Sequence, residues 1–189
     1  MIIMLSGTSS SGKSTLAHEL KNTLSDHWLI FSTDDYLSML GEKFLNLHPD
    51  NLSVCDPNAV CYAKKHIDGT FEIIPGELCS KLYLTIPNTL DLIAKSGFNI
   101  ILDSFITTTM EFDSYKNQLS KHGLFSVYLY ASEKEIERRE TTRGDRLKGS
   151  AIHWLRKFDF QNQCDLLINT EKMTMNTCSE TIIDKINIK

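Results

Sequence analysis

Nine residues near the N-terminus have the types and the spacing of a phosphate-binding loop. They fit the pattern G-x-x-x-x-G-K-[ST] in full and are Gly7, Thr8, Ser9, Ser10, Ser11, Gly12, Lys13, Ser14 and Thr15. The two glycines allow the backbone to curl so that successive N–H groups face an anion. The lysine can then reach the β- and γ-phosphates of a nucleotide, and the serine that follows it can ligate Mg²⁺. We therefore expect all nine residues to bind a nucleotide.

Two aspartates follow short apolar segments that we expect to form strands. Asp34 comes shortly after Trp28–Phe31, and Asp103 directly follows Phe98–Leu102. Because ligands in an open α/β sheet lie beyond the carboxyl ends of the strands, both carboxylates are expected near the phosphates. Asp34 can there take the proton of an acceptor hydroxyl as a general base. Asp103 has the Walker B position, and together with Ser14 it is predicted to hold Mg²⁺.

Four arginines fall within nine consecutive positions: Arg138, Arg139, Arg143 and Arg146. Phosphoryl transfer spreads negative charge over the γ-phosphoryl oxygens, and arginines on a mobile lid can neutralise it and exclude water. We expect Arg139, Arg143 and Arg146 to act in this way, from a lid over about residues 139–156. The alternative is a solvated helix face with Arg138 as a surface residue. Its partners would be Glu133, Glu135, Glu137 and Glu140.

Several other residues that could take part in chemistry also have a purely structural interpretation. Asp34 or Asp35 can simply cap a helical turn at Tyr36–Leu40. The six histidines are scattered without the spacing of metal ligands, and we assign none of them a role. The five cysteines are odd in number and form no CxxC pair, which favours reduced thiols in a cytoplasmic protein over a disulfide framework or a zinc site.

These side chains must be positioned by strands that alternate with helices. The expected strands are Ile2–Ser6, Trp28–Phe31, Phe98–Leu102, Leu124–Tyr130 and Asp165–Ile168. The expected helices are Lys13–Leu24, Pro75–Lys95 with a kink at Pro87 and a Gly97 cap, Glu111–Lys121, Glu133–Thr142 and Ser179–Ile188. Asp68-Gly69 between apolar residues signals a hairpin turn. This alternation predicts one α/β domain over residues 1–189, with a five-stranded, mostly parallel sheet that carries helices on both faces.

Composition narrows the classes of function. Hydrophobic residues make up 41% of the 189 residues, which indicates a globular protein with a full core. The formal net charge is −4, so the basic stripe that nucleic acid requires is absent and no nucleic-acid partner is expected. The apolar runs are strand-sized, and the first residues lack the basic region of a signal peptide, so no membrane partner is expected. The oligomeric state stays open, with a homo-oligomer as one alternative.

The sequence resembles the chloramphenicol phosphotransferase-like branch of P-loop kinases. The matching stretches are Gly7–Thr15, Trp28–Asp34, Asp68–Gly76, Ile100–Phe105, Arg139–Arg146 and Cys164–Thr170. The resemblance implies ATP and Mg²⁺ as cofactors, and phosphorylation of a small-molecule hydroxyl like that of a chloramphenicol 3-O-phosphotransferase, with antibiotic resistance as a consequence. It also implies catalytic roles, which fall on Asp34 as the base and on Lys13, Arg139, Arg143 and Arg146 at the phosphates.

The acceptor pocket is expected within about residues 36–75, where Gly41–Tyr62 matches the family least. The side chains proposed to line it are Tyr36, Met39, Leu40, Phe44, Phe105 and Met110. Two other functions stay open. One is a kinase of another metabolite, such as a nucleoside, a sugar nucleotide or a shikimate-like compound. The other is a nucleotide-binding switch or toxin-like effector, against which Asp34 argues because a switch needs no base.

Overall fold

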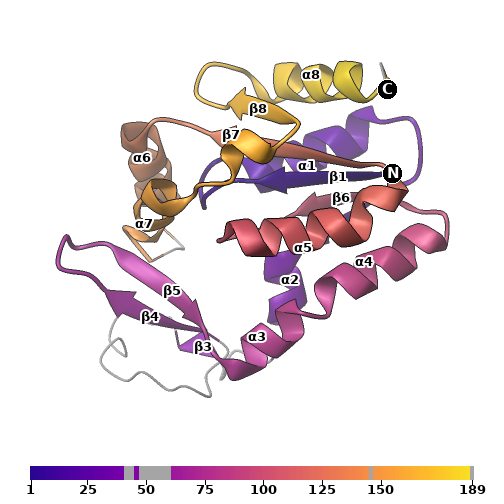
Figure 1. Ribbon diagram of the computed structural model, residues 1–189. Coiled ribbons are helices and arrows are strands. Elements are labelled where there is room, and N and C mark those ends of the chain that lie inside the picture. The colour runs from indigo at the N-terminus through magenta and orange to yellow at the C-terminus, as the bar shows by residue number, and fades with distance from the viewer. Residues whose placement is uncertain (41–44, 47–60, 145–146, 188–189) are drawn as a thin grey trace.

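The centre of the molecule is a five-stranded sheet in which every strand pairing is parallel (Figure 1). The computed structural model describes residues 1–40, 45–46, 61–144 and 147–187. The strands are β1 (Ile2–Ser6), β2 (Trp28–Ser32), β6 (Asn99–Asp103), β7 (Leu124–Tyr130) and β8 (Leu166–Asn169), in the order β2-β6-β1-β7-β8. The predicted α/β fold and its five strands are therefore confirmed, with β1 at the middle of the sheet.

Helices cover both faces of this sheet, as the sequence predicts (Figure 1). They are α1 (Lys13–Thr23), α2 (Thr33–Ser38), α3 (Glu77–Tyr83), α4 (Ile86–Lys95), α5 (Thr109–Leu119), α6 (Glu133–Arg143), α7 (Ser150–Lys157) and α8 (Met175–Asn187), with short 3-10 helices at Ser120–His122 and Gln161–Gln163. Helices α1 and α8 pack on one face, and α4 and α5 pack on the other. Among the described residues, none of these helices has both the length and the apolar character that a membrane span requires.

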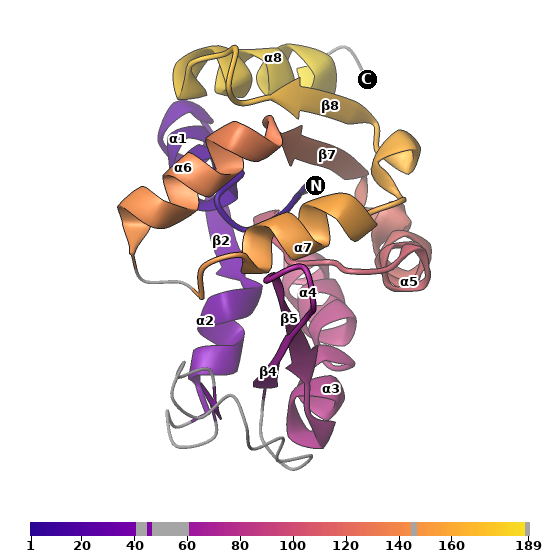
Figure 2. The same ribbon diagram turned by 90° about the vertical axis from the view of Figure 1, so that its left-hand side faces the viewer.

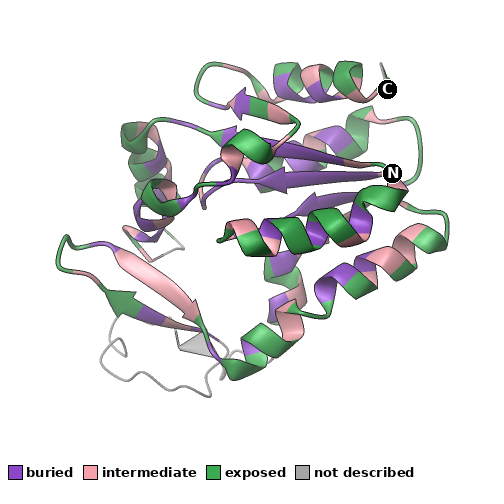
Figure 3. Cartoon of the chain, in the orientation of Figure 1, coloured by how far each residue is buried: buried purple, intermediate pink, exposed green. Residues whose placement is uncertain are grey.

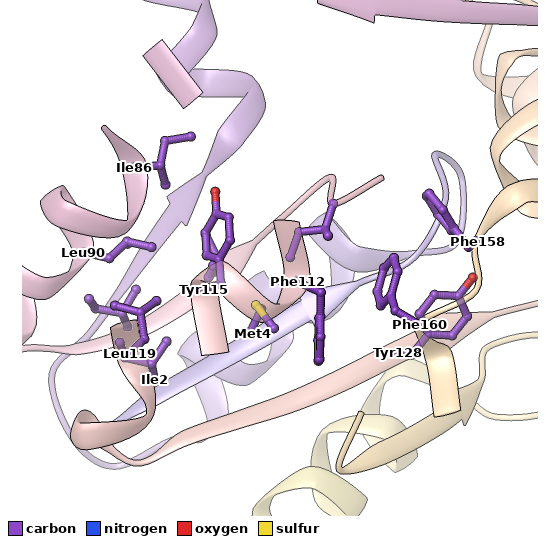
Figure 4. Packing of buried hydrophobic residues seen from close by; sticks show 13 residues of the cluster. Ile2, Met4, Ile86, Leu90, Phe112, Tyr115, Leu119, Tyr128, Phe158 and Phe160 are labelled. Atoms are coloured by element: carbon purple, nitrogen blue, oxygen red, sulfur yellow. The ribbon is translucent and has the colours of Figure 1, made fainter. Parts of the chain in front are cut away.

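The core consists of two apolar clusters that share the sheet. Successive side chains of a strand point to opposite faces, so one strand contributes to both clusters. Ile2 and Met4 of β1 face α4 and α5 (Figure 4), whereas Ile3 and Leu5 face α1 and α8. All four side chains are fully buried, which explains why the strand is an uninterrupted apolar run rather than an alternating one (Figure 3).

A second, smaller sheet lies beside α7 (Figure 2). Its strands are β3 (Leu45–Asn46), β4 (Cys61–Lys65) and β5 (Phe71–Pro75), in the order β3-β4-β5. β4 and β5 form the hairpin predicted at Asp68-Gly69, where Gly69 has a φ of 82° and the Asp68 carboxylate accepts the Thr70 N–H at 3.0 Å. The parallel pairing of β3 with β4 was not predicted.

The prediction of one kinked helix over Pro75–Lys95 is wrong in detail, because this segment forms two separate helices. α3 ends at Tyr83, and α4 begins at Ile86. Pro87 lies in the first turn of α4, where its missing N–H would have no partner in the helix anyway. A proline that could only kink a helix interior is thus tolerated at a helix start. Gly97 follows α4 with a φ of 91° and ends it as predicted.

Candidate active site

The loop between β1 and α1 has the backbone shape of a phosphate cradle. Gly7 and Gly12 have φ values of 138° and 101°, and Ser10 has a φ of 62°. A Cβ atom on Gly7 would lie 2.4 Å from the carbonyl oxygen of Leu129, so no other residue fits at that position. α1 begins at Lys13, and the first N–H groups of a helix have no partner within it. The loop therefore presents backbone donors and a helix N-terminus to an anion.

Lys13 is buried in the wall of this loop. Its Nζ donates hydrogen bonds to the carbonyl oxygens of Gly7 and Thr8, both at 2.9 Å. The hydroxyl oxygens of Ser10 and Ser11 are buried and have no hydrogen-bond partner among the described residues. An anion seated in the loop would supply acceptors for groups of this kind.

The metal-binding pair that the sequence predicts is brought together. The Ser14 hydroxyl donates a hydrogen bond of 2.5 Å to Oδ2 of Asp103, which is the last residue of β6 and is buried. The next residue, Ser104, is fully buried and donates to the carbonyl oxygen of Leu5 at 2.9 Å, so it joins β6 to β1. The Asp103 carboxylate and the Ser14 hydroxyl thus lie together at the end of β6.

Asp34 does not cap a helix, and neither does Asp35. α2 begins at Thr33, three residues earlier than predicted, and its N-cap is Ser32, whose hydroxyl accepts the Asp35 N–H at 3.3 Å. Asp34 is an exposed residue of the first turn. The Thr33 hydroxyl accepts the N–H of Phe105 at 3.3 Å, which fixes this turn to the end of β6. The capping interpretation is therefore wrong. The first turn of α2 instead determines the position of Asp34.

One cavity of about 430 Å³ collects most of the predicted site residues. From the loop it is lined by Ser9, Ser10, Gly12, Lys13, Ser14 and Thr15, and from elsewhere by Thr33, Asp34, Asp103, Ser104, Phe105, Glu135, Arg138, Arg139, Arg143 and Met175. Gly7, Thr8 and Ser11 of the predicted nine do not line it. The Thr8 hydroxyl instead donates to the carbonyl oxygen of Ala151 at 2.7 Å. Arg146 lies outside the described residues.

The arginines of α6 are held by protein partners. Arg139 donates from Nε to Glu135 at 2.7 Å and from both terminal nitrogens to Thr170, at 3.0 Å to the hydroxyl and 2.9 Å to the carbonyl oxygen. Arg138 makes a two-point ion pair with the same Glu135, as its predicted surface role implies, but it also lines the cavity. The hydrogen bonds from Arg138 and Arg139 hold the pKa of the Glu135 carboxyl well below its usual value.

The alternative of a solvated helix face would make Glu140 a surface partner of the arginines, and for this residue that alternative is wrong. Its side chain is 2% exposed and lies on the same helix face as buried Ile136. Its carboxylate accepts the N–H groups of Gly149 at 2.6 Å and Ala151 at 3.0 Å, and the Ser150 hydroxyl at 3.2 Å. Glu140 therefore fixes the start of α7 against α6. The charge pattern hides this role, although the spacing of Ile136 and Glu140 places them on one face.

A second cavity, of about 450 Å³, borders the first at Phe105, which lines both. Its other lining residues are Cys61, Ile73, Pro75, Ser80, Tyr83, Leu84, Pro87, Thr107, Met110, Glu111, Ser114, Tyr115, Gln118 and Trp154. Most of these side chains are aromatic or aliphatic. They come from α3, α4, α5 and α7 as well as from the small sheet, so this cavity extends beyond the predicted segment of residues 36–75.

Of the five side chains predicted for an acceptor pocket that the structure describes, two line this cavity, namely Phe105 and Met110. The Tyr36 hydroxyl instead forms hydrogen bonds with the hydroxyls of Thr85 and Thr89. Leu40 packs on the small apolar cluster of Leu37, Cys61 and Cys79, and Met39 is 77% exposed. Phe44 lies outside the described residues.

Glu111 is the carboxyl group of the second cavity, and it was not among the predicted site residues. Its side chain accepts the N–H of Thr107 at 2.9 Å, and its own N–H is capped by the Thr108 hydroxyl at 3.2 Å. Burial raises the pKa of Glu111 despite the hydrogen bonds from Thr107. The T-x-x-E pattern at Thr108–Glu111 is a helix-start signal that would have placed this residue in the first turn of α5.

Comparison with known sequences gives one family. The sequence profile of the family described as chloramphenicol phosphotransferase-like protein matches residues 1–187. Curated protein sequences contain no significant match to the chain.

Solved structures with the same fold include several kinases. The APS kinase of Mycobacterium tuberculosis in complex with AMPPNP and APS has a TM-score of 0.66 at 13% identity, covering 100% of this chain and 97% of its own. The shikimate kinase of Acinetobacter baumannii in complex with shikimate has a TM-score of 0.63 at 15% identity, covering 99% and 93%. The tunicamycin resistance protein of Deinococcus radiodurans has a TM-score of 0.62 at 16% identity, covering 98% and 94%. At these identities the similarity shows a shared fold, which is that of P-loop kinases.

Proposed function

Because the chain belongs to the chloramphenicol phosphotransferase-like protein family, we propose that it transfers the γ-phosphoryl group of ATP to a hydroxyl group of a small molecule. The observation that carries this proposal is the meeting of two different cavities at Phe105. One is lined by the phosphate loop, three carboxylates and arginines, and the other is lined mainly by aromatic and aliphatic side chains. A polar nucleotide site beside an apolar site is what transfer to an organic acceptor requires.

The residues of the first cavity suit ATP and Mg²⁺. The positive φ angles of Gly7, Ser10 and Gly12, together with the buried serine hydroxyls, fit a polyphosphate in the loop. Ser14 and Asp103 offer a hydroxyl and a carboxylate oxygen, the hard oxygen ligands that Mg²⁺ prefers, and would hold it. When bound, Mg²⁺ neutralises negative charge on the phosphate oxygens.

Asp34 is proposed as the general base. Its carboxylate takes the proton of the acceptor hydroxyl while that oxygen forms a bond to the γ-phosphorus. The bond between the γ-phosphorus and the bridging oxygen breaks, and ADP leaves with the electron pair. Lys13 and Arg143 line the same cavity and supply positive charge where the transferred group carries negative charge.

The second cavity is proposed to hold the acceptor. Its aromatic wall, formed by Phe105, Tyr83, Tyr115 and Trp154, suits a flat or apolar molecular body. This lining favours an aromatic alcohol over a small, fully polar metabolite. Chloramphenicol combines a nitrophenyl ring with hydroxyl groups, and it is therefore the first acceptor to test.

Substitution of Asp34 tests the proposal, with Asp35→Asn as a matched control on the next residue of the same exposed helical turn. Asp34→Asn keeps the size of the side chain but cannot take a proton. We expect single-turnover transfer to fall by about 10²–10⁴-fold, the usual range for a lost general base. ATP affinity and the melting temperature are expected to stay near those of the wild type, because Ser32 caps the helix and Asp34 does not.

Acceptors are first identified by mass spectrometry, as compounds that gain one phosphoryl group from ATP. Near-normal transfer in Asp34→Asn would remove this residue from the mechanism. If no hydroxyl compound is phosphorylated while ATP is hydrolysed and a protein partner is retained, the kinase proposal fails in favour of a nucleotide-dependent switch.

A further inference from the structure

A second group of chemically active side chains lies between the β4–β5 hairpin and α7. It consists of His66, which follows β4, Glu72 in β5 and His153 in α7. One ligand atom from each residue lies within 4.8 Å of the other two. None of the three residues lines the phosphate cavity or the apolar cavity. The hairpin and α7 are neighbours in both views of the fold (Figures 1 and 2).

Both imidazole rings direct a nitrogen at one carboxylate. His66 Nε2 is 3.0 Å from Glu72 Oε2, and His153 Nε2 is 3.9 Å from Glu72 Oε1. The two rings are stacked, with centroids 4.5 Å apart and planes inclined by 23°. The three side chains therefore converge on a common point, although they come from two separate structural units.

The hydrogen bonds behind His153 determine which of its nitrogens carries a lone pair. The Thr70 hydroxyl has one proton, which it donates to Asp68 Oδ1 at 2.7 Å. The 3.3 Å contact between the Thr70 oxygen and His153 Nδ1 therefore needs the proton of Nδ1. This leaves Nε2 of neutral His153 with its lone pair toward Glu72 and His66. A ring nitrogen oriented by a hydrogen bond on its other side is the usual arrangement of a metal-ligating histidine.

The remaining nitrogen of His153 has no hydrogen-bond partner in the part of the chain that the structure describes. The residue is only 6% exposed, and Nε2 is buried. A buried polar atom without a partner costs free energy, so its presence needs an explanation. A bound ion would supply that partner.

We propose that His66, Glu72 and His153 bind one divalent transition-metal ion of the Zn²⁺ type. Two imidazole nitrogens and one carboxylate oxygen form a ligand set that zinc uses with a fourth position open to water. Mg²⁺ and Ca²⁺ prefer sites made of oxygen atoms alone and are expected to bind poorly to this site. Lys157 Nζ lies 3.4 Å from Glu72 Oε1, but its side chain is 48% exposed and is free to turn into solvent when the ion binds.

The ion would join the small sheet to α7 and, through α7, to the phosphate loop. The carbonyl oxygen of Ala151, in the first turn of α7, accepts the hydroxyl of Thr8. The hairpin meets the start of the same helix, where the Phe71 N–H donates to the carbonyl oxygen of Gly149 at 3.5 Å. Zinc is therefore expected to stabilise this junction without a place in the phosphoryl-transfer chemistry.

Zinc titration of the full-length, chelator-treated protein tests the proposal. The variants are His66→Ala and Glu72→Gln, both of partly exposed side chains, and the control is His27→Ala, an exposed histidine far from the site in the sequence. Wild type and control are expected to bind one Zn²⁺ per chain, to melt at a higher temperature with Zn²⁺ but not with Mg²⁺, and to show slower amide exchange in residues 66–72 and 150–157. In each variant the Kd for Zn²⁺ is expected to rise at least about tenfold.

Two results would overturn the proposal. One is the absence of any zinc-dependent rise in melting temperature for the wild type. The other is a Zn²⁺ affinity that stays unchanged in His66→Ala and Glu72→Gln, which would place the ion elsewhere, for example on cysteines. Co²⁺ separates the sites further, because its visible spectrum with nitrogen and oxygen ligands lacks the intense bands of thiolate coordination. The melting temperature of each metal-free variant shows that it is folded.

Discussion

Lys13 and Asp34 reach the same cavity, but the protein holds them in different ways. Lys13 is buried and donates two hydrogen bonds to carbonyl groups of its own loop, whereas Asp34 is exposed in the first turn of a short helix. A substitution at Lys13 should therefore affect the loop as well as the reaction. A substitution at Asp34 should act mainly on the reaction, because Ser32 and not Asp34 caps α2.

Replacing Lys13 by alanine is expected to lower transfer by at least about 10²–10³-fold, because the positive group proposed to act on the transferred phosphoryl is lost. It also leaves the carbonyl groups of Gly7 and Thr8 without two donors, which should lower the free energy of unfolding by roughly 1–3 kcal/mol. Lys21→Ala, an exposed position on the same helix, is the control. Normal turnover in Lys13→Ala, measured beside a urea unfolding curve, would contradict the phosphate-loop assignment.

Glu111 should make stability depend on pH. Burial raises its pKa in the folded protein above the ordinary value of 4.5, so the unfolded chain releases this proton first as pH rises. The contribution of Glu111 to the free energy of unfolding is therefore greatest below the ordinary pKa and is lost as pH rises through the raised pKa. Glu111→Gln keeps an oxygen acceptor for Thr107 and cannot ionise.

The measurement is the difference in urea midpoint between wild type and Glu111→Gln, taken from about pH 5 to pH 8. We expect the wild type to lose stability relative to the variant as pH increases. A difference that stays constant over this range would mean that the carboxyl of Glu111 is not perturbed by burial.

Helices α6 and α7 form a corner beside the site, in which α6 lines the first cavity and Trp154 of α7 lines the second. Arg138, Arg139 and Arg143 lie on α6, and Glu140 on its buried face binds the start of α7. Ala151 and Ile152 of α7 pack against Ile136 of α6. The proposed lid is thus anchored by a carboxylate and an apolar contact, and we propose that it moves as a corner rather than as a loose loop.

Glu140→Ala should release this corner. The N–H groups of half-buried Gly149 and buried Ala151 lose their acceptor, which is expected to lower the free energy of unfolding by about 1–3 kcal/mol and to speed amide exchange in residues 147–157. Glu137→Ala, one turn earlier on the exposed side, should change stability by less than about 0.5 kcal/mol. Equal effects of the two substitutions in thermal melts and exchange would show that Glu140 is an ordinary surface residue.

The elements that were predicted best from the sequence are those that can be recognised from a short stretch of neighbouring residues. The strands of the large sheet are short apolar runs, and the phosphate loop has fixed spacing, so both could be recognised without the structure. α7 was not predicted, and the charges around Glu140 hid its role, although its spacing from Ile136 places both residues on one face of α6. His66 and His153 also looked scattered, since only the packing of the hairpin on α7 brings them together.

The two sheets differ in how firmly they are packed. The large sheet has an extensive apolar cluster on each face, whereas the small cluster beside the hairpin, as far as the described residues show it, consists of Leu37, Cys61 and Cys79 with four partly buried neighbours. Most of β5 is only half-buried. The cavity proposed for the acceptor is lined by residues of both regions, so one side of its wall is firmly packed and the other side is weakly packed.

This difference predicts an order of local stability. Backbone amides of residues 61–75 are expected to exchange with solvent faster than those of β1, β6 and β7 under native conditions, because opening the hairpin exposes less apolar surface. Hydrogen-exchange mass spectrometry of the ligand-free protein measures both sets in one experiment. Equal protection of the hairpin and the central strands would contradict this order.

The central place of β1 also determines when the protein can fold during its synthesis. β1 is made before any other strand, yet Ile2 pairs with Ile100 of β6 on one side and Leu124 of β7 on the other. Both partners leave the ribosome roughly a hundred residues later, and long-range pairings of this kind are slow to form. Until then, the five residues of β1, four of which are apolar, lack the neighbouring strands that bury them. The phosphate loop, although it precedes β6 and β7 in the chain, therefore acquires its shape late, and a nascent chain that stalls before β7 should bind chaperones rather than nucleotide.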